Sequence, residues 1–600
     1  MLAAGLSPAI SGYAATSGSG SVSHLTLVGT TTMRGAAARV QTADGTSNEL
    51  GGMPELAIVK MDSLAHVPAP QAAQVNGNRV VAGELPSFGG FNGLNHRDQR
   101  TLGISLSAPQ FSLEPPDQGL CVGNGQVLEP INAALRVFNP DGTAGSIVAL
   151  NAFFGVAPAI VRSTPPVFGE FVSDPKCYFD PGAQRWFVTA LQIHQDPNTG
   201  AFRPRTHTFI GVSQTADANG TFSVYSLDAT DDGQGGTPSH TACPCFGDQP
   251  LIGADANGLY VSTNEYNLGD STHPFGSVFN GAQIYAISKA DLVNLVTAPK
   301  FVQINAGEVS LSGDGVANSV QPAASPAGHY ESARGGTEYF LMSMDFSRVI
   351  IIPRHSTPVT SIALWALTNT GSLNSGAPNL HLNHVEIGSE LYGQPPDAEQ
   401  KSGDLFLGDI VHSPLSLVQA NDDRMNQVVF ADGKLWSAVN TAVQTENGPT
   451  RVGVAYFVVA PSVTNGLTGA IAGQGYVSVN QENLLFPSIG VTDAGKAVMT
   501  FSLLGPDIFP SQAYATLDVS TGVGSLHVGA PGQGPQDGFT GYRKIVGGNG
   551  DARWGDYSAA VADTSGTVWF AQEYIAHPAT DTSTRTLNAN WATFIGHVTP

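Results

Sequence analysis

One pattern recurs seven times along the sequence: a short apolar strand ends at Asp or Asn, a tight turn follows, and a second apolar strand begins. Examples are GDQPLIGADANGLYVSTNEY at 247–266 and FPSIGVTDAGKAVMTFSLLG at 486–505. Such a repeat requires a modular architecture, because each copy must bury its apolar face against the next copy. With the turn residue as marker, the copies lie at Asn124, Asp180, Asp255, Pro326, Asp432, Asp493 and Asp563.

Each copy also carries two further strand-like segments, such as 451–462 and 471–480 in the fifth copy. β-branched and aromatic residues alternate there between Gly, Asn and Asp turn signals, which is typical of strands. Seven copies of four antiparallel strands predict an all-β chain that folds as a seven-bladed β-propeller. A row of separate β-sandwiches is the alternative, and it is less favoured because no linkers separate the copies.

The pattern also predicts how the ends of the chain are used. Residues 111–600 form the propeller, but the last copy has segments for only three strands. The N-terminal segment 51–110 is expected to supply the closing strand, from either 54–62 or 100–108, which would remove exposed sheet edges. Residues 1–50 are expected to be a flexible leader or the remnant of a signal peptide.

Composition narrows the function classes. The chain has 26 Lys and Arg against 48 Asp and Glu, a net charge of −22. A nucleic-acid partner is not expected, because such proteins present a basic face. Only 12% of residues are charged, four are Cys, and no apolar stretch is long enough to span a membrane. These features predict a secreted protein, extracellular or periplasmic, that acts as a monomer on a glycan or another extracellular ligand.

Four aspartates stand at nearly the same distance before their turn markers. Asp117, Asp248 and Asp556 each lie seven residues earlier, and Asp174 lies six earlier. Each is expected at the start of the innermost strand of its blade, at the mouth of the central channel. Converging carboxylates repel one another, which a Ca²⁺ ion held by Asp117, Asp248 and Asp556 would relieve. Two alternatives stay open: acid–base catalysis by all four, as in glycoside chemistry, and simple capping of turns.

Ligand-binding residues are expected on one face of the propeller. The turns between first and second strands are short, whereas the loops between second and third strands and between copies are long. Arg424 and Arg553 are expected beside the acidic arc, where they would partly neutralise it and contact substrate. The aromatic residues Tyr266, Phe275 and Trp554 are expected on the same face and would suit sugar stacking, with ordinary packing as the alternative.

The cysteines indicate a disulfide pairing. Cys121 and Cys177 each lie three residues before a turn marker, in neighbouring first strands. Equivalent positions on neighbouring strands favour a Cys121–Cys177 bond, which leaves Cys243 to pair with Cys245. A zinc site at Cys243 and Cys245 is disfavoured because no second ligand pair accompanies it.

Several segments carry a family resemblance. PPDQGLCVGNG, DPKCYFD, RMNQVVFADGKLW and RWGDYSAAVAD resemble segments of large secreted bacterial seven-bladed β-propeller proteins of uncharacterised activity. The segment ADTSGTVWF is similar to the Asp-box turn of sialidase-type propellers, but it lacks the Ser and the strict spacing of that motif. The resemblance implies a fold and transfers no catalytic residue. Two functions remain: a carbohydrate-active hydrolase or lyase, and a non-catalytic propeller that binds a glycan or a protein.

Overall fold

The computed structural model describes residues 20–40, 72–101, 111–161, 163, 165–269, 275–312, 315–326, 328–345, 359–446, 448–546 and 550–600. The chain is all-β, as the repeat predicted, and its helices are single short turns or two turns at most. None of the helices in these ranges is long and apolar enough to cross a bilayer. The helices are α1 (Met33–Val40), α2 (His96–Thr101), α3 (Leu150–Phe154), α4 (Lys289–Val293), α5 (Phe406–Val411) and α6 (Arg543–Val546).

The first three antiparallel sheets follow the repeat. The first contains β5 (Cys121–Gly123), β6 (Gln126–Ile131), β7 (Ala134–Phe138) and β8 (Val148–Ala149). The second contains β11 (Glu170–Asp180), β12 (Arg185–Gln195), β13 (Phe202–Ser213) and β14 (Thr221–Asp228). The third contains β15 (Cys245–Ala254), β16 (Gly258–Leu268), β17 (Phe275–Ser288) and β18 (Lys300–Asn305).

Two further meanders share one nine-stranded sheet, because their first strands β19 and β24 pair in parallel. One consists of β19 (Gln321–Ala324), β20 (Thr337–Ser343), β21 (Val359–Thr368) and β22 (His381–Tyr392). The other consists of β24 (Val428–Ala431), β25 (Lys434–Thr445), β26 (Thr450–Ser462) and β27 (Thr468–Val477), with β3 (Ala73–Val75) parallel to β25.

The last two sheets complete the series. One contains β28 (Asn483–Val491), β29 (Ala497–Leu504), β30 (Ser511–Asp518), β31 (Gly522–Val523) and β32 (His527–Ala530). The other contains β34 (Ala559–Ala562), β35 (Val568–Tyr574), β36 (Ala592–Val598) and β4 (Gly89–Asn95). Two short pairs stand apart, β9 (Ile160–Val161) with β10 (Val167–Phe168), and β23 (Leu417–Val418) with β33 (Asp551–Ala552). Six of the seven turn markers lie between the first and second strands of their meanders, and Asp180 is the last residue of its first strand, β11.

The N-terminal part of the chain pairs with strands far away in sequence. β4 is antiparallel to β36, so a strand that precedes Asp117 is the fourth strand of the last sheet. Of the segments expected to supply it, 54–62 lies outside the described residues, and of 100–108 only the end of α2 is described. Residues 21–40 differ from the expected flexible leader. β1 (Ser21–His24) and β2 (Thr26–Thr32) pair with the outer strands β18 and β14, because each is a short edge strand that satisfies an exposed edge.

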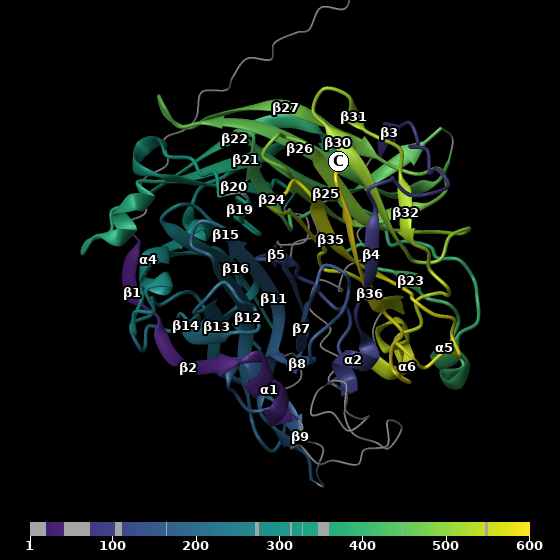
Figure 1. Cartoon of the computed structure of the whole chain (residues 1–600), viewed down its shortest axis with the longest axis horizontal. Helices are drawn as coiled ribbons and strands as arrows, with labels where there is room; N and C mark the ends of the chain where they lie inside the picture. Colours follow the sequence, from purple (N-terminus) through teal and green to yellow (C-terminus); the bar gives the residue numbers. More distant parts are fainter. Residues whose placement is uncertain are drawn as a thin grey trace, which may run out of the picture.

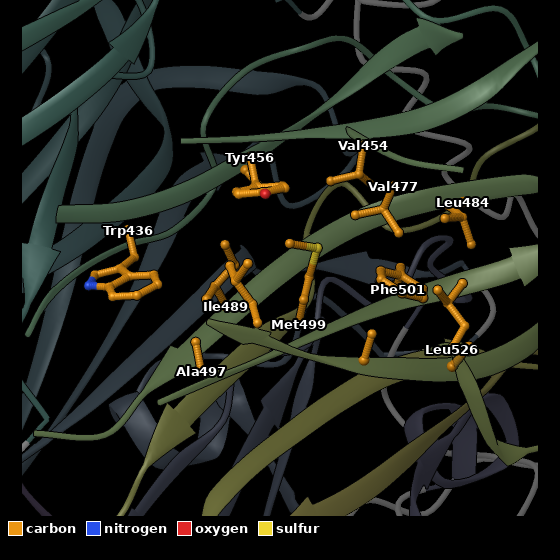
Figure 2. Close-up of a cluster of buried hydrophobic side chains, with 14 of the residues drawn as sticks. Trp436, Val454, Tyr456, Val477, Leu484, Ile489, Ala497, Met499, Phe501 and Leu526 are labelled. Atoms are coloured by element: carbon orange, nitrogen blue, oxygen red, sulfur yellow. The ribbon is translucent and has the colours of Figure 1, made fainter. Parts of the chain in front are cut away.

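Both faces of each sheet are covered by its neighbours, which explains the long apolar runs. In β29 every residue is buried, and successive side chains point to opposite neighbours. Met499 and Phe501 pack with Trp436 and Val454 of the preceding meander, as Figure 2 shows. Val498 instead joins a cluster that includes side chains of β34–β36.

The sheets follow one another around a common centre in chain order, from β5–β8 through β19–β27 to β34–β36 (Figure 1). A mixed apolar cluster fills the space between each sheet and the next. The cluster of Leu120, Val122, Val127 and Phe138 with Trp569, Ala571 and Ile595 packs the last sheet against the first.

Candidate functional site

A backbone irregularity marks the inner strands. A non-glycine residue with a φ of 43° to 60° precedes or interrupts the first strand of each meander, namely Asp117, Asp174, Gln249, Ser319, Asn421, Phe486 and Asp556. L-residues seldom adopt this conformation, and Asp and Asn adopt it more readily than others. In β11, β15 and β28 it coincides with a shift in strand register, that is, a β-bulge. The structural equivalent of Asp174 is therefore Gln249, one residue after the predicted Asp248.

Three of these strained residues are held by an Asn from the preceding meander. The backbone N–H of Asp174 donates to Asn132 Oδ1 at 2.9 Å, that of Ser319 to Asn264 Oδ1 at 2.7 Å, and that of Phe486 to Asn440 Oδ1 at 2.9 Å. Sequence reasoning missed these asparagines. They recur eight or nine residues after their turn markers, which is the signal that identifies them.

The four predicted aspartates lie together around Tyr557. We call Asp117, Asp174, Asp248 and Asp556 the central acidic cluster; each is at most 5% exposed. Burial raises the pKa of Tyr557 well above its ordinary value, and all four carboxylates raise it further. Turn capping alone does not describe Asp174 and Asp556, because both carboxylates accept hydrogen bonds from Gln249 of another sheet.

Amide groups connect Asp117, Asp174 and Asp556 of the cluster. Asn132 Nδ2 donates to Asp117 Oδ2 at 2.7 Å, while its Oδ1 holds Asp174. The backbone N–H of Gln249 donates to Asp174 Oδ2 at 3.3 Å, and Gln249 Nε2 donates to Asp556 Oδ2 at 3.5 Å. These bonds link the first, second, third and last sheets.

A buried lysine that the sequence analysis missed lies within the cluster. Lys176 Nζ lies 3.1 Å from the centre of the Tyr557 ring, a cation–π contact. Burial lowers the pKa of Lys176 to about 7, although Asp117, Asp174 and Asp556 raise it. Its signal in the sequence was its place two residues after Asp174, in the same strand β11.

Both predicted arginines lie beside the cluster and are engaged by protein groups. Arg553 Nη2 lies 2.5 Å from Asp556 Oδ1. Arg424 forms an ion pair with Asp422, and its Nη1 donates to Gln249 Oε1 at 2.8 Å. Their side chains are only 7% exposed. Arg553 and Lys176 therefore offset part of the charge of the cluster, whereas Arg424 is paired with Asp422 outside it.

The predicted sugar-stacking residues do not form one platform. Trp554 is 1% exposed and its indole N–H donates to Ser502 Oγ at 3.0 Å, so packing, not stacking on a sugar, accounts for it. Tyr266 is half-buried against Phe246 and Phe279. Phe275 begins β17, and its side chain lies outside the described part of the structure.

Other perturbed carboxyl groups lie close to the cluster. Burial raises the pKa of Glu573 well above its ordinary value, although the backbone N–H of Gly555 donates to Glu573 Oε2 at 2.8 Å. Burial also raises the pKa of Glu114 to about 7. Shifted pKa values of this kind gather at functional sites and in buried ion networks alike.

Among the described residues, the predicted calcium ligands do not form a group whose ligand atoms lie close enough together to share one metal ion. Ligand atoms that all lie within 4.8 Å of one another occur at Asp231, His240 and Glu265, and at Cys243, Cys245 and Glu265. Asp117, Asp248 and Asp556 form no such group within the described ranges. A calcium ion there stays a prediction.

Both predicted disulfides are present. Cys121–Cys177 joins the first and second sheets with its Cα atoms 5.8 Å apart, and Cys243–Cys245 closes a short loop before β15. The pairing inferred from equivalent strand positions is confirmed, and it leaves Cys243 and Cys245 without free thiols for zinc.

Two cavities lie away from the central acidic cluster. One of about 440 Å³ opens beside the short turns and is lined by residues that include Asn257, Tyr330 and Glu331. Another of about 320 Å³ is lined by residues that include Arg334, His381 and Val463. None of the predicted site residues lines either cavity.

Comparisons with known proteins give no family. No family model and no curated protein matches the chain. Among solved structures, the chain is similar to a protein of unknown function from Dyadobacter fermentans, with 10% identity, 71% of this chain and 94% of that chain covered, and a TM-score of 0.31. It is also similar to an α-L-arabinanase from Penicillium chrysogenum, with 10% identity, 70% and 92% covered, and a TM-score of 0.29.

A third similar structure is the NanB sialidase from Streptococcus pneumoniae, with 9% identity, 86% of this chain and 71% of that chain covered, and a TM-score of 0.31. Likeness at this level carries no argument about chemistry. Function is therefore inferred from this chain's own residues.

Proposed function

We propose that the chain is a seven-bladed β-propeller with one four-stranded meander per blade. The packing of the last sheet against the first supports this proposal, as does the contribution of β4 to the last sheet. Recurrence of the strained inner residue at the start of each meander supports it too. Closure by packing and by a shared sheet is what a propeller needs to avoid exposed edges.

The proposed function is non-catalytic binding of a neutral glycan on the face where the first strands begin. The long connections 229–244, 393–427 and 531–558 open on this face, and rigid scaffolds carry binding residues on such loops. A net charge of −22 disfavours anionic ligands and leaves neutral ones. The two disulfides support export to an oxidising compartment.

The observation that carries this choice is the state of the central acidic cluster. Its carboxylates are buried, and its surroundings are already filled by Lys176, Arg553 and Asn132. A glycosidase needs two carboxyl groups that can reach a glycosidic bond, one to protonate the leaving oxygen and one to attack or to activate water. Carboxyl groups buried in this way serve better as the centre that ties the blades together.

Glycan hydrolysis is the second candidate, and the shifted pKa values favour it. Lys176 and Glu114 both have a pKa of about 7, which suits general acid–base catalysis near neutrality. If the protein is a hydrolase, Asp117 or Asp174 would be the second catalytic group beside Lys176 or Glu114.

One experiment separates the two functions. Purified protein is tested against a panel of neutral and acidic polysaccharides, by affinity electrophoresis for binding and by release of reducing ends for hydrolysis, with and without EDTA. The expected result is retention by a neutral polysaccharide without release of reducing ends. Release that Asp174→Asn abolishes while the variant stays folded would establish hydrolysis, and an absence of retention by every polysaccharide would refute glycan binding.

A pair of matched variants locates the binding face. Tyr266→Ala alters a half-buried aromatic residue on the loop-bearing face and is expected to weaken retention. Tyr330→Ala alters an aromatic residue on the short-turn side and is expected to leave retention unchanged. Weaker retention by Tyr330→Ala with unchanged retention by Tyr266→Ala would place the binding site on the short-turn face instead. The EDTA arm tests the predicted calcium ion at Asp117, Asp248 and Asp556.

A further inference from the structure

Three acid–base side chains meet at one end of the third meander, apart from the central acidic cluster. Asp231 and His240 come from the connection between β14 and β15, and Glu265 comes from β16. His240 Nδ1 lies 3.0 Å from both carboxylate oxygens of Glu265 and 3.5 Å from Asp231 Oδ2. One ligand atom from each residue lies within 4.8 Å of the other two.

The cluster is buried and short of positive charge. The side chains of Asp231 and Glu265 are 0% and 1% exposed, and that of His240 is 13% exposed. Asp228 and Glu308, which also act electrostatically on Asp231 and His240, are acidic as well. Two buried carboxylates that face one imidazole repel each other unless one of them is protonated or a cation lies between them. Burial and the neighbouring Glu265 raise the pKa of Asp231 to about 9, so a bound cation would have to displace the proton that Asp231 holds at neutral pH.

The hydrogen bonds of the cluster are incomplete. Asp231 Oδ2 accepts from Gln303 Nε2 at 2.7 Å, and Glu265 Oε1 accepts from Asn280 Nδ2 at 2.8 Å. Asp231 Oδ1 is buried and accepts no hydrogen bond. A fully buried carboxylate oxygen without a donor is costly, which a bound cation would offset.

We propose that Asp231, His240 and Glu265 form a binding site for one divalent transition-metal ion. One imidazole nitrogen and two carboxylate oxygens are a donor set that Zn²⁺ accepts, and the imidazole favours a transition metal over Ca²⁺. Three protein ligands are the number used where a fourth position is left for water or a substrate. This site differs in place and in donor chemistry from the calcium site predicted at Asp117, Asp248 and Asp556.

The Cys243–Cys245 disulfide adjoins the site. Cys243 Sγ lies 3.7 Å from Glu265 Oε1, and Asn280 Nδ2 lies 3.5 Å from Cys245 Sγ. In the oxidised protein neither sulfur is a thiolate, so the ligands are the imidazole and the two carboxylates. The bond closes the loop just after His240 and restrains it beside β15.

The test is zinc binding by the oxidised full-length protein after treatment with chelator. Equilibrium dialysis against ZnCl₂ with tenfold excess CaCl₂, with metal measured by mass spectrometry, compares wild type with His240→Gln and Glu265→Gln. His194→Gln is the matched control, because His194 Nδ1 lies 2.9 Å from Glu170 Oε1 in a similar pair that is outside the proposed site. Wild type and the control are expected to bind one more zinc per chain than either site variant, or to bind it at least tenfold more tightly. Equal binding by all four proteins, or none by wild type, would overturn the proposal.

A second measurement needs no variant. Carbethoxylation of histidines, read by peptide mass spectrometry, is performed on wild type with and without ZnCl₂. Zinc is expected to protect His240 and to leave His194 reactive. Equal modification of His240 in both samples would overturn the proposal even if the variants fail to fold.

Discussion

Replacing Asn132 by Ala tests whether the central acidic cluster holds the blades together. Asn132 is buried and forms four side-chain hydrogen bonds, to Asp174 N, Ser173 Oγ, Pro115 O and the Asp117 carboxylate. At about 1 kcal/mol for each neutral bond and about 2 kcal/mol for the bond to the carboxylate, Asn132→Ala is expected to cost about 5 kcal/mol of unfolding free energy.

Asn440 offers a matched control in an equivalent position. It is also buried and also holds a strained inner residue, but it forms two neutral bonds, from Phe486 N and to Ala420 O. Asn440→Ala is expected to cost about 2 kcal/mol. Of the difference of about 3 kcal/mol, about 2 kcal/mol comes from the bond to the Asp117 carboxylate and about 1 kcal/mol from the bond to Ser173 Oγ.

Equilibrium urea unfolding, followed by tryptophan fluorescence, measures both variants. Equal losses of unfolding free energy for Asn132→Ala and Asn440→Ala would refute the reasoning, because both asparagines would then only stabilise the bulged backbone next to them. A larger loss for Asn132→Ala together with unchanged glycan retention would support a structural role for the cluster.

Three further outcomes are expected. Burial raises the pKa of Glu114 and of Glu129 from 4.5 to about 7. Because the folded state binds these two protons more tightly than the unfolded state, each group contributes about 3 kcal/mol of unfolding free energy below pH 4.5. This contribution is lost as the pH rises from 4.5 to 7. Calorimetry should therefore show a melting temperature that falls from pH 5 to pH 8, less steeply in Glu129→Gln, and a rise would contradict the assignment. Phe501→Ala removes a fully buried ring and is expected to cost 3–5 kcal/mol by urea unfolding, against less than about 1 kcal/mol for the half-buried Val519→Ala. Reducing Cys121–Cys177, which spans 56 residues, is expected to cost about 4 kcal/mol, and an unchanged urea midpoint after reduction would count against its role in joining the first two sheets.

The repeat in the sequence was sufficient to predict the all-β class, the turn between the first two strands of each meander, and both disulfides. Each of these depends on local chemistry: alternation of apolar residues, Gly and Asp at turns, and Cys at matching distances from a turn. The same spacing brought Asp117, Asp174, Asp248 and Asp556 to one region. In the third meander the spacing selected Asp248, whereas the structural equivalent of Asp174 is Gln249, one residue later. Counting along the sequence assumes a constant strand register, and a β-bulge changes that register.

Only the tertiary structure decided what surrounds those aspartates. Lys176, Asn132 and Gln249 reach the cluster from separate sheets, and Trp554 is buried by packing that the sequence does not display. The edge pairing of β1 and β2 likewise depends on partners more than a hundred residues away. Local sequence determines which strands and turns form, whereas burial, charge balance and long-range pairing arise only when the sheets pack together.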